Sequence, residues 1–229
     1  MICRLRNAFR VSLVLVAACL LALQVLLAYE APLTPAAIHE AYVLGRRNDQ
    51  ATANFLDPYI KQLTAGPQNP SITQIEVLTP FAQVVDLSRR NATTNYTEEQ
   101  AADDYRRKGD TLVVQITLML PAAYANAAQN VLPETPPPAE NKAASLAPEN
   151  FWQNFRFSLK QHGKVIATRS IHNRPIYSAA TTDTPSVLDG AMVWLEYDAK
   201  DVASDIATVE SLTPESKTIS ATFDLNKLR

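Results

Sequence analysis

Three aspartates in the C-terminal third of the chain form the first group that could do chemistry. Asp198, Asp201 and Asp205 lie at the end of an expected strand and in the loop after it. Calcium takes about six to eight oxygen ligands, and carboxylates gathered in a loop can supply them. However, the glycine turn of an EF-hand is missing and Lys200 competes for the acids. The three residues are a candidate calcium site, but their spacing favours an ordinary hydrated loop.

Glu196 and Asp198 form a second carboxylate pair, separated by one residue on the same expected strand. Alternation along a strand places both side chains on one face. Paired carboxylates can act as general acid and general base, so this pair supports a carbohydrate-active or hydrolytic enzyme as an alternative function. No residue of the chain is assigned as catalytic.

The densest charges of the chain lie in the segment 98–108. Asp103 with Arg107 and Asp104 with Lys108 are spaced at i and i+4. This spacing is typical of ion pairs on a solvated helix. It predicts a surface helix and not a pair of catalytic acids.

The remaining chemistry-bearing residue types are scattered. His39, His162 and His172 are not at ligand spacing, so a zinc site would need groups from distant elements. His172 has Arg169 and Arg174 nearby and could belong to an anion pocket, although its position favours the surface at a strand end. No G-x-S-x-G motif occurs, and the five glycines form no phosphate-binding loop. The sequence predicts no cofactor.

Aromatic residues gather in two of the expected strands, with Trp152, Phe155 and Phe157 in one and Trp194 and Tyr197 in the other. Facing solvent, they would make a platform for a sugar or a peptide. Their alternating phase favours packing in the core.

The first 28 residues are predicted to be a targeting or anchoring segment. Three arginines and no acid precede the apolar run 11–28, which is the pattern of a secretory signal. The run is close to the length that spans a membrane, so an uncleaved anchor and cleavage near Ala28 both stay open. Val16 to Cys19 resembles a lipobox, which makes Cys19 a possible lipid attachment site. Each alternative contacts a membrane through residues 11–28 and places the remaining chain outside the cytoplasm.

The composition narrows the choice of partner. Cys3 and Cys19 are the only cysteines, so the exported part must be held together by its core. A formal net charge of −2 argues against a nucleic-acid partner, which needs a basic face. A protein or a glycan remains the expected partner.

The pattern of elements predicts a mainly β fold, an antiparallel β-sandwich of immunoglobulin-like or similar type. N-terminal helices and one short inserted helix starting at the Thr97 capping box accompany it. The expected division is a signal or anchor at 1–28, a linker and helices at 29–66, and the sandwich domain at 67–229 with a Pro/Ala-rich loop at 121–148. Strands are expected at 75–87, interrupted at Thr79-Pro80, at 111–120 and 191–197, and in hairpins at 151–171 and 206–225.

The segments AAIHEAYVLGRRNDQATANFLDPYIKQL, ITQIEVLTPFAQVV and SATFDLNKLR resemble a group of exported bacterial proteins of unknown function. The resemblance implies a bacterial, extracytoplasmic setting and carries no activity or site residues with it. The expected function is a membrane-tethered cell-envelope protein with a non-enzymatic binding or structural role. It would be anchored in the inner membrane with its domain in the periplasm, or secreted after cleavage.

Overall fold

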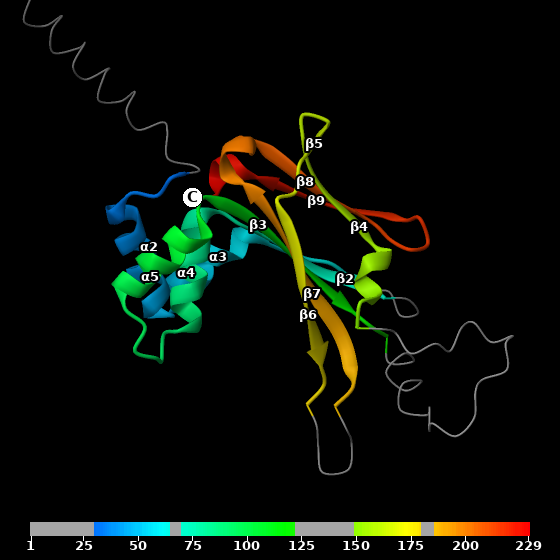
Figure 1. The fold of residues 1–229 in the computed structure, drawn as a ribbon, viewed down its shortest axis with the longest axis horizontal. Helices are drawn as coiled ribbons and strands as arrows, with labels where there is room; N and C mark the ends of the chain where they lie inside the picture. Colours follow the sequence, from blue (N-terminus) through cyan, green and yellow to red (C-terminus); the bar gives the residue numbers. More distant parts are fainter. Residues whose placement is uncertain (1–29, 65–69, 122–148, 180–185) are drawn as a thin grey trace, which may run out of the picture.

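The computed structural model describes residues 30–64, 70–121, 149–179 and 186–229. Within this part, two antiparallel sheets form the body of the protein, which confirms the predicted antiparallel two-sheet class (Figure 1). Sheet A contains, in spatial order, β1 (Ile60–Gln62), β2 (Ser71–Leu78), β3 (Thr111–Met119), β7 (Leu188–Asp198) and β6 (Ser170–Tyr177). Sheet B contains β5 (Lys164–Ile166), β4 (Arg156–Gln161), β8 (Ile206–Leu212) and β9 (Thr218–Asp224).

The main apolar core lies between the two sheets. Alternate residues of β3, such as Val114 and Ile116, pair with Leu195 and Val193 of β7, and all four are completely buried. They belong to one cluster with residues of sheet B, including Leu159 and Val209. Period-two alternation therefore gives the central strands of sheet A an apolar face against sheet B.

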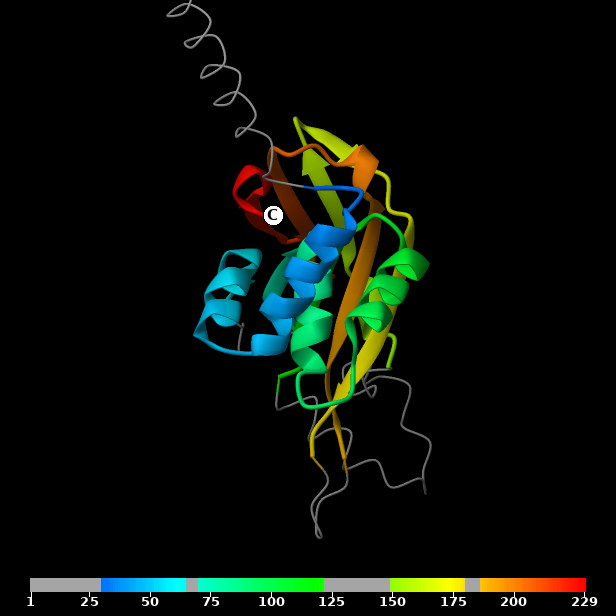
Figure 2. The ribbon, with the colours of Figure 1, turned by 90° about the vertical axis from the view of Figure 1, so that its left-hand side faces the viewer.

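A layer of four helices lies on the opposite side of sheet A (Figure 2). The helices are α2 (Pro35–Arg47), α3 (Gln50–Leu56), α4 (Pro80–Arg90) and α5 (Glu98–Lys108). Helices α4 and α5 lie next to the strands, and α2 and α3 pack outside α4. Thr34 caps α2 by accepting a hydrogen bond from the Ala37 amide, and Thr97 caps α5 in a capping box with Gln100. Short 3-10 turns complete the elements: η1 (Asp57–Tyr59), η2 (Phe151–Asn154), η3 (Ala199–Asp201) and η4 (Leu225–Lys227).

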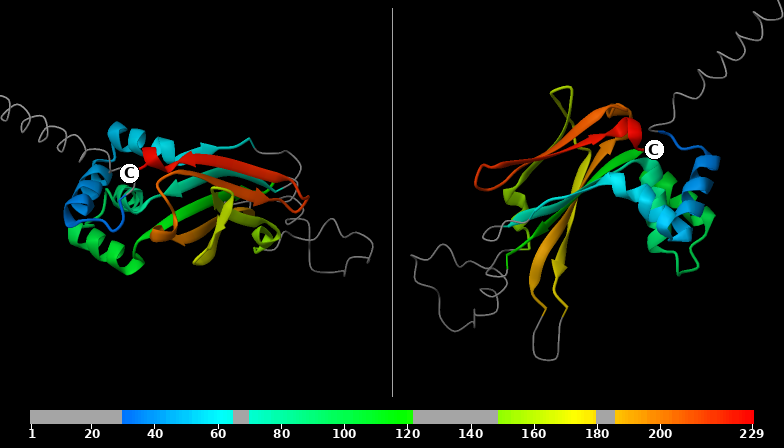
Figure 3. Two further views of the ribbon diagram at one scale, coloured as in Figure 1. Left: turned by 90° about the horizontal axis from the view of Figure 1, so that it is seen from above. Right: turned by 180° about the vertical axis from the view of Figure 1, so that it is seen from behind.

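The N-terminal helices and the C-terminus belong to the same body as the sheets. Strand β1 follows η1 directly and joins sheet A, and Tyr59 is buried. The C-terminal residue Arg229 lies beside the N-terminal helices (Figure 3), where it forms an ion pair with Glu40 and its carbonyl accepts a hydrogen bond from the Tyr59 hydroxyl. The segment predicted as a linker with helices thus shares its core with the sandwich.

The expectation of one interrupted strand over 75–87 is wrong after Leu78. Thr79 is the N-cap of α4, and Pro80 occupies its first turn. Proline at that position loses no intrahelical hydrogen bond, so Thr-Pro begins a helix here as Thr34-Pro35 does at α2. The buried residues of α4 recur along most of the helix: Pro80, Phe81, Ala82, Val84, Val85, Asp86 and Ser88.

The expected hairpin over 151–171 is also shorter than predicted. Residues 151–154 form η2, and the return strand β5 ends at Ile166. The chain then crosses to the other sheet, where β6 pairs with β7 from Ser170 onward. Strand β6 therefore forms one edge of sheet A, and this places His172 and Arg174 in the helix-bearing sheet.

Several predictions concern residues outside the described part. They are the apolar run 11–28, Cys19, and residues 122–148 of the predicted loop. Among the described residues, no helix has the length and apolar character needed to span a membrane.

Helices α2 and α4 approach each other unusually closely at Gly45. A Cβ atom at Gly45 would overlap the Val85 carbonyl oxygen and would lie 2.7 Å from the Ser88 Cβ. This contact sets the distance between α2 and α4. Only glycine permits the approach.

We expect Gly45→Ala to lower the free energy of unfolding by about 2 kcal/mol, because a buried atom is added where no space exists. The sign is informative, since Gly→Ala in a helix without such a contact stabilises by roughly 1 kcal/mol. Urea unfolding measures the difference. Val43→Ala, at an exposed position of the same helix, serves as control and should change stability little. A gain in stability for Gly45→Ala would contradict the close helix contact.

Candidate functional site

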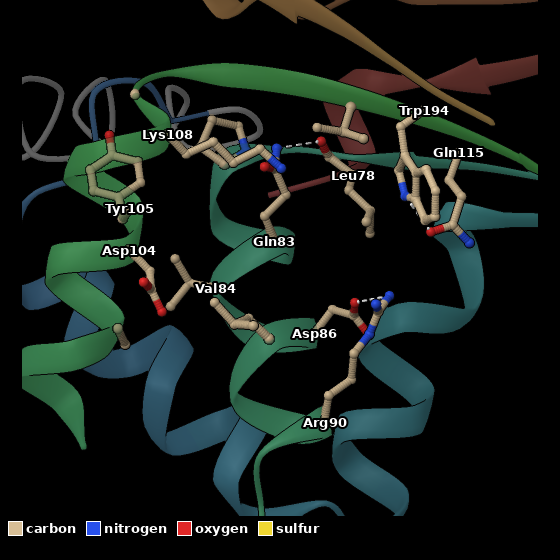
Figure 4. A pocket seen from close by; sticks show the side chains of 15 residues that line it. Leu78, Gln83, Val84, Asp86, Arg90, Asp104, Tyr105, Lys108, Gln115 and Trp194 are labelled. Atoms are coloured by element: carbon tan, nitrogen blue, oxygen red, sulfur yellow. Dashed lines mark hydrogen bonds and ion pairs between the residues drawn. The ribbon is translucent and has the colours of Figure 1, made fainter. Parts of the chain in front are cut away.

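A pocket of about 200 Å³ lies between α4, α5 and the outer face of sheet A (Figure 4). Trp194 and Gln115 from the sheet stand at one end, and Lys108 and Tyr105 from α5 stand at the other. The walls between them are mainly aliphatic. The aliphatic lining residues are Leu78, Val84, Leu87, Ala101 and Val113.

Trp194 is fixed in position by neighbours on two strands. Its indole Nε1 donates a hydrogen bond of 2.8 Å to the Oε1 of Gln115, the residue directly opposite on β3. On the other side, His172 of β6 stacks on the indole with ring centroids 5.3 Å apart and an angle of 12° between the planes. The Arg174 guanidinium lies 5.8 Å from the ring centroid. The indole thus marks the boundary between the pocket and the edge strand β6.

Two carboxyl groups are buried between the sheet and α4. Asp86 is bound by Arg89 at 2.8 Å and by Arg90 at 2.5 Å, so its charge is compensated by two arginines. Glu76 projects from β2 beside this group and is only 6% exposed. Burial, reinforced by the negative charge of Asp86, raises the pKa of Glu76 to about 7, while the two arginines oppose the shift.

Lys108 and Glu196 form a second charged pair at the α5 end. The Lys108 Nζ lies 3.9 Å from a Glu196 carboxylate oxygen, and the other oxygen accepts a hydrogen bond from the Ser170 hydroxyl. Partial burial lowers the pKa of the Lys108 amine, which the charge of Glu196 partly offsets. The ionised groups that line the pocket therefore already have partners of opposite charge.

The three aspartates of the candidate calcium site are not brought together. Asp198 pairs with Arg169 at 3.4 Å, and Asp205 pairs with His162 at 2.7 Å. Asp201 lies in the separate turn η3. Among the described residues, no group of three or more His, Cys, Asp or Glu side chains could hold a metal ion.

The carboxylates proposed for a hydrolase do share a strand face, but each is next to a cation. Glu196 faces Lys108, and Asp198 faces Arg169 at the end of β7. The surface ion pairs of α5 differ from the predicted spacing: Arg106 binds Asp103 and Arg107 binds Asp104, both at i and i+3. This change leaves Lys108 available to Glu196.

The expected grouping of aromatic residues separates into two faces. Tyr197 is completely buried, and burial raises the pKa of its hydroxyl. Trp194, three residues earlier, points to the helix-bearing face, as alternation requires. Phe155 and Phe157 stack on each other at 6.1 Å, and Trp152 does not line the pocket. Tyr197 and Phe155 thus lie in the core, while Trp152, Phe157 and Trp194 are partly buried and pack against it.

Sequence reasoning missed the ion pairs of Asp86 at the pocket wall and the buried Glu76 beside them, which lies outside the pocket lining. Glu76 stands between Ile75 and Val77, and a carboxyl group within an apolar strand is a recognisable signal. The sequence places Asp86 in a strand and Arg89 and Arg90 in the polar loop after it, so it gives no sign of their helical spacing at i, i+3 and i+4.

We expect stability to fall as Glu76 loses its proton. Folded Glu76 titrates at about 7, while the ordinary value is 4.5. The folded state therefore holds the proton more tightly, and stability decreases by roughly 3 kcal/mol as the pH rises from about 4.5 to just above 7. Glu76→Gln should remove this slope and stabilise the protein at pH 8, with little effect at pH 4.

Urea unfolding between pH 4 and 8.5 measures this difference. Glu215→Gln, at an exposed turn position, controls for the loss of one negative charge and should keep the wild-type slope. Equal slopes in wild type and Glu76→Gln would show that Glu76 is not the titrating group.

Comparisons with known proteins add no information about this site. Comparison of the chain with protein-family models, with curated proteins and with solved structures gave no match.

Proposed function

We propose that the protein is a membrane-tethered component of the bacterial cell envelope with a non-enzymatic binding role, and that the pocket between α4, α5 and sheet A is its ligand site. The observation that carries the proposal is the pocket itself: aliphatic walls, a fixed indole at one end and charged groups that are already paired. The body would be a sandwich of immunoglobulin-like or similar type.

The size and lining of the pocket indicate the kind of ligand. Pockets for drug-sized molecules measure about 300–1,000 Å³, so a pocket of about 200 Å³ suits a smaller apolar group. The indole of Trp194 favours a flat, aromatic group that can contact its ring. A small aromatic molecule, or an aromatic group of a protein or glycan partner, fits this description.

A neutral aromatic probe tests the pocket directly. The chain has two tryptophans, so Trp152→Phe leaves Trp194 as the only one. In this variant, N-phenyl-1-naphthylamine should quench Trp194 emission saturably, with one probe per protein. Ala101→Leu fills the pocket and should weaken binding at least about fivefold.

Ala203→Leu, on the exposed surface beyond η3, is the matched control and should bind the probe unchanged. Thermal unfolding of each variant shows whether it is folded. Unchanged binding by folded Ala101→Leu would exclude the pocket as the ligand site.

The tethering part of the proposal rests on the N-terminal sequence. The arginines before residue 11 and the apolar run 11–28 support export, with an anchor, a cleaved signal near Ala28 and lipid attachment at Cys19 as alternatives.

Fractionation of the bacterial host should separate these alternatives. An anchored or lipidated chain would sediment with membranes and be released by detergent but not by high salt. A cleaved chain would appear in the periplasm or the medium without its first 28 residues. Incorporation of a labelled fatty acid would mark only a lipidated chain, and Cys19→Ser would abolish that label. Recovery of the full-length chain from the cytoplasm would contradict export.

The second candidate function is a carboxylate-dependent hydrolase, and the raised pKa of Glu76 beside Asp86 is the observation that favours it. Against it, Glu76 does not line the pocket and Asp86 is held by two arginines. Hydrolysis of a chromogenic glycoside or ester that Glu76→Gln abolishes in the folded protein would support the hydrolase over the binding function.

A further inference from the structure

The outer face of sheet A continues beyond Trp194 onto the edge strand β6. His172 stands directly across from Trp194 in the strand register, and Arg174 follows two residues later on the same face. Both side chains are exposed, and both contact the indole. The end of the pocket at Trp194 is therefore bordered by an imidazole and a guanidinium.

In the part of the chain that the structure describes, His172 and Arg174 have no acidic partner, unlike Lys108 and Arg169, the other basic residues at this face. The Glu196 carboxylate pairs with Lys108 and accepts a hydrogen bond from Ser170, and Asp198 pairs with Arg169. Among the described residues, neither His172 nor Arg174 forms an ion pair. Up to two positive charges thus lie next to the aromatic end of the pocket without compensation.

The contact of Arg174 with the indole affects how it can bind. A guanidinium placed over an aromatic ring is held by cation–π attraction and keeps its N–H donors available for a carboxylate, sulfonate or phosphate. The His172 ring, stacked nearly parallel to the indole, presents its nitrogens at the ring edge. Both sets of donors lie beside the end of the pocket where an aromatic ligand would be held.

We propose that His172 and Arg174 bind the anionic group of the ligand, and that the ligand is a small aromatic anion. Its flat apolar part would occupy the pocket against Trp194, and its carboxylate, sulfonate or phosphate would reach the two cationic side chains. This inference rests on the proposed binding function and adds the charge of the ligand to it.

Two probes that differ only in charge test the inference. 8-Anilinonaphthalene-1-sulfonate carries a sulfonate, and N-phenyl-1-naphthylamine has the same ring systems without it. In the Trp152→Phe background, the anionic probe should bind about five- to tenfold more tightly than the neutral one. Salt at 0.5 M should reduce this preference, because exposed charges are screened.

Arg174→Gln and His172→Gln should each lower the affinity for the anionic probe by about threefold or more and lower the affinity for the neutral probe by a clearly smaller factor. Arg156→Gln is the matched control, since Arg156 is an exposed arginine on the other sheet. Circular dichroism and thermal unfolding verify that the variants fold, which their exposed positions favour.

The possible outcomes distinguish the anion site from the proposed binding function. Equal affinity for the two probes, or an equal loss of both in Arg174→Gln, overturns the anion site while the binding function stands. The second result would mean that Arg174 only supports Trp194. Failure of both probes to bind the folded protein overturns the proposed function, and the inference falls with it.

Discussion

Strand β3 is buried on both of its faces, and the arrangement of the other elements depends on this burial. Val114 and Ile116 face sheet B, whereas Val113 and Gln115 face the helices, and all four are buried. Each face therefore needs a complementary layer. The inner face packs against the apolar face of sheet B, and the outer face packs against α4 and α5. Helix α4 in turn makes a close contact with Gly45 of α2.

The two faces of sheet A meet different chemical demands. The inner face is almost entirely aliphatic, and close packing alone stabilises it. The outer face buries two carboxyl groups, which is costly unless the charge is removed or compensated. Asp86 is compensated by Arg89 and Arg90, whereas burial favours the protonated form of Glu76. Both solutions reduce the cost of burying an acid between the helices and the sheet.

Much of the fold could be predicted from local patterns, and the errors have a common physical cause. The alternation in 111–120 and 206–225 predicted β3 and the β8–β9 hairpin, because each pattern is contained within its own segment. The dipeptide Thr79-Pro80 is compatible with a strand break and with a helix start. The helix forms because α4 packs against α2 and the sheet. The crossing of the chain from β5 to β6 is likewise decided by pairing with β7, which is distant in sequence.

The candidate site was less predictable than the fold, because its residues come from five separate elements. Leu78, Asp86, Lys108, Gln115 and Trp194 each look ordinary within their own segment. His172 with its neighbouring arginines did suggest an anion pocket, but the sequence placed it at a strand end and could not link it to Trp194. Strand register supplies that link, since it aligns Gln115, Trp194 and His172 across three strands.

This alignment also explains why a binding site would form at this point of the sheet. Gln115 lies under the helices, where the low local dielectric strengthens polar contacts and fixes the indole. His172 lies on the uncovered edge strand, where a ligand can approach from solvent. Trp194 stands between these two environments and contacts both residues. A charged ligand could therefore keep its anionic group partly hydrated at the edge while its apolar part leaves water, which avoids the cost of burying an ion in the pocket.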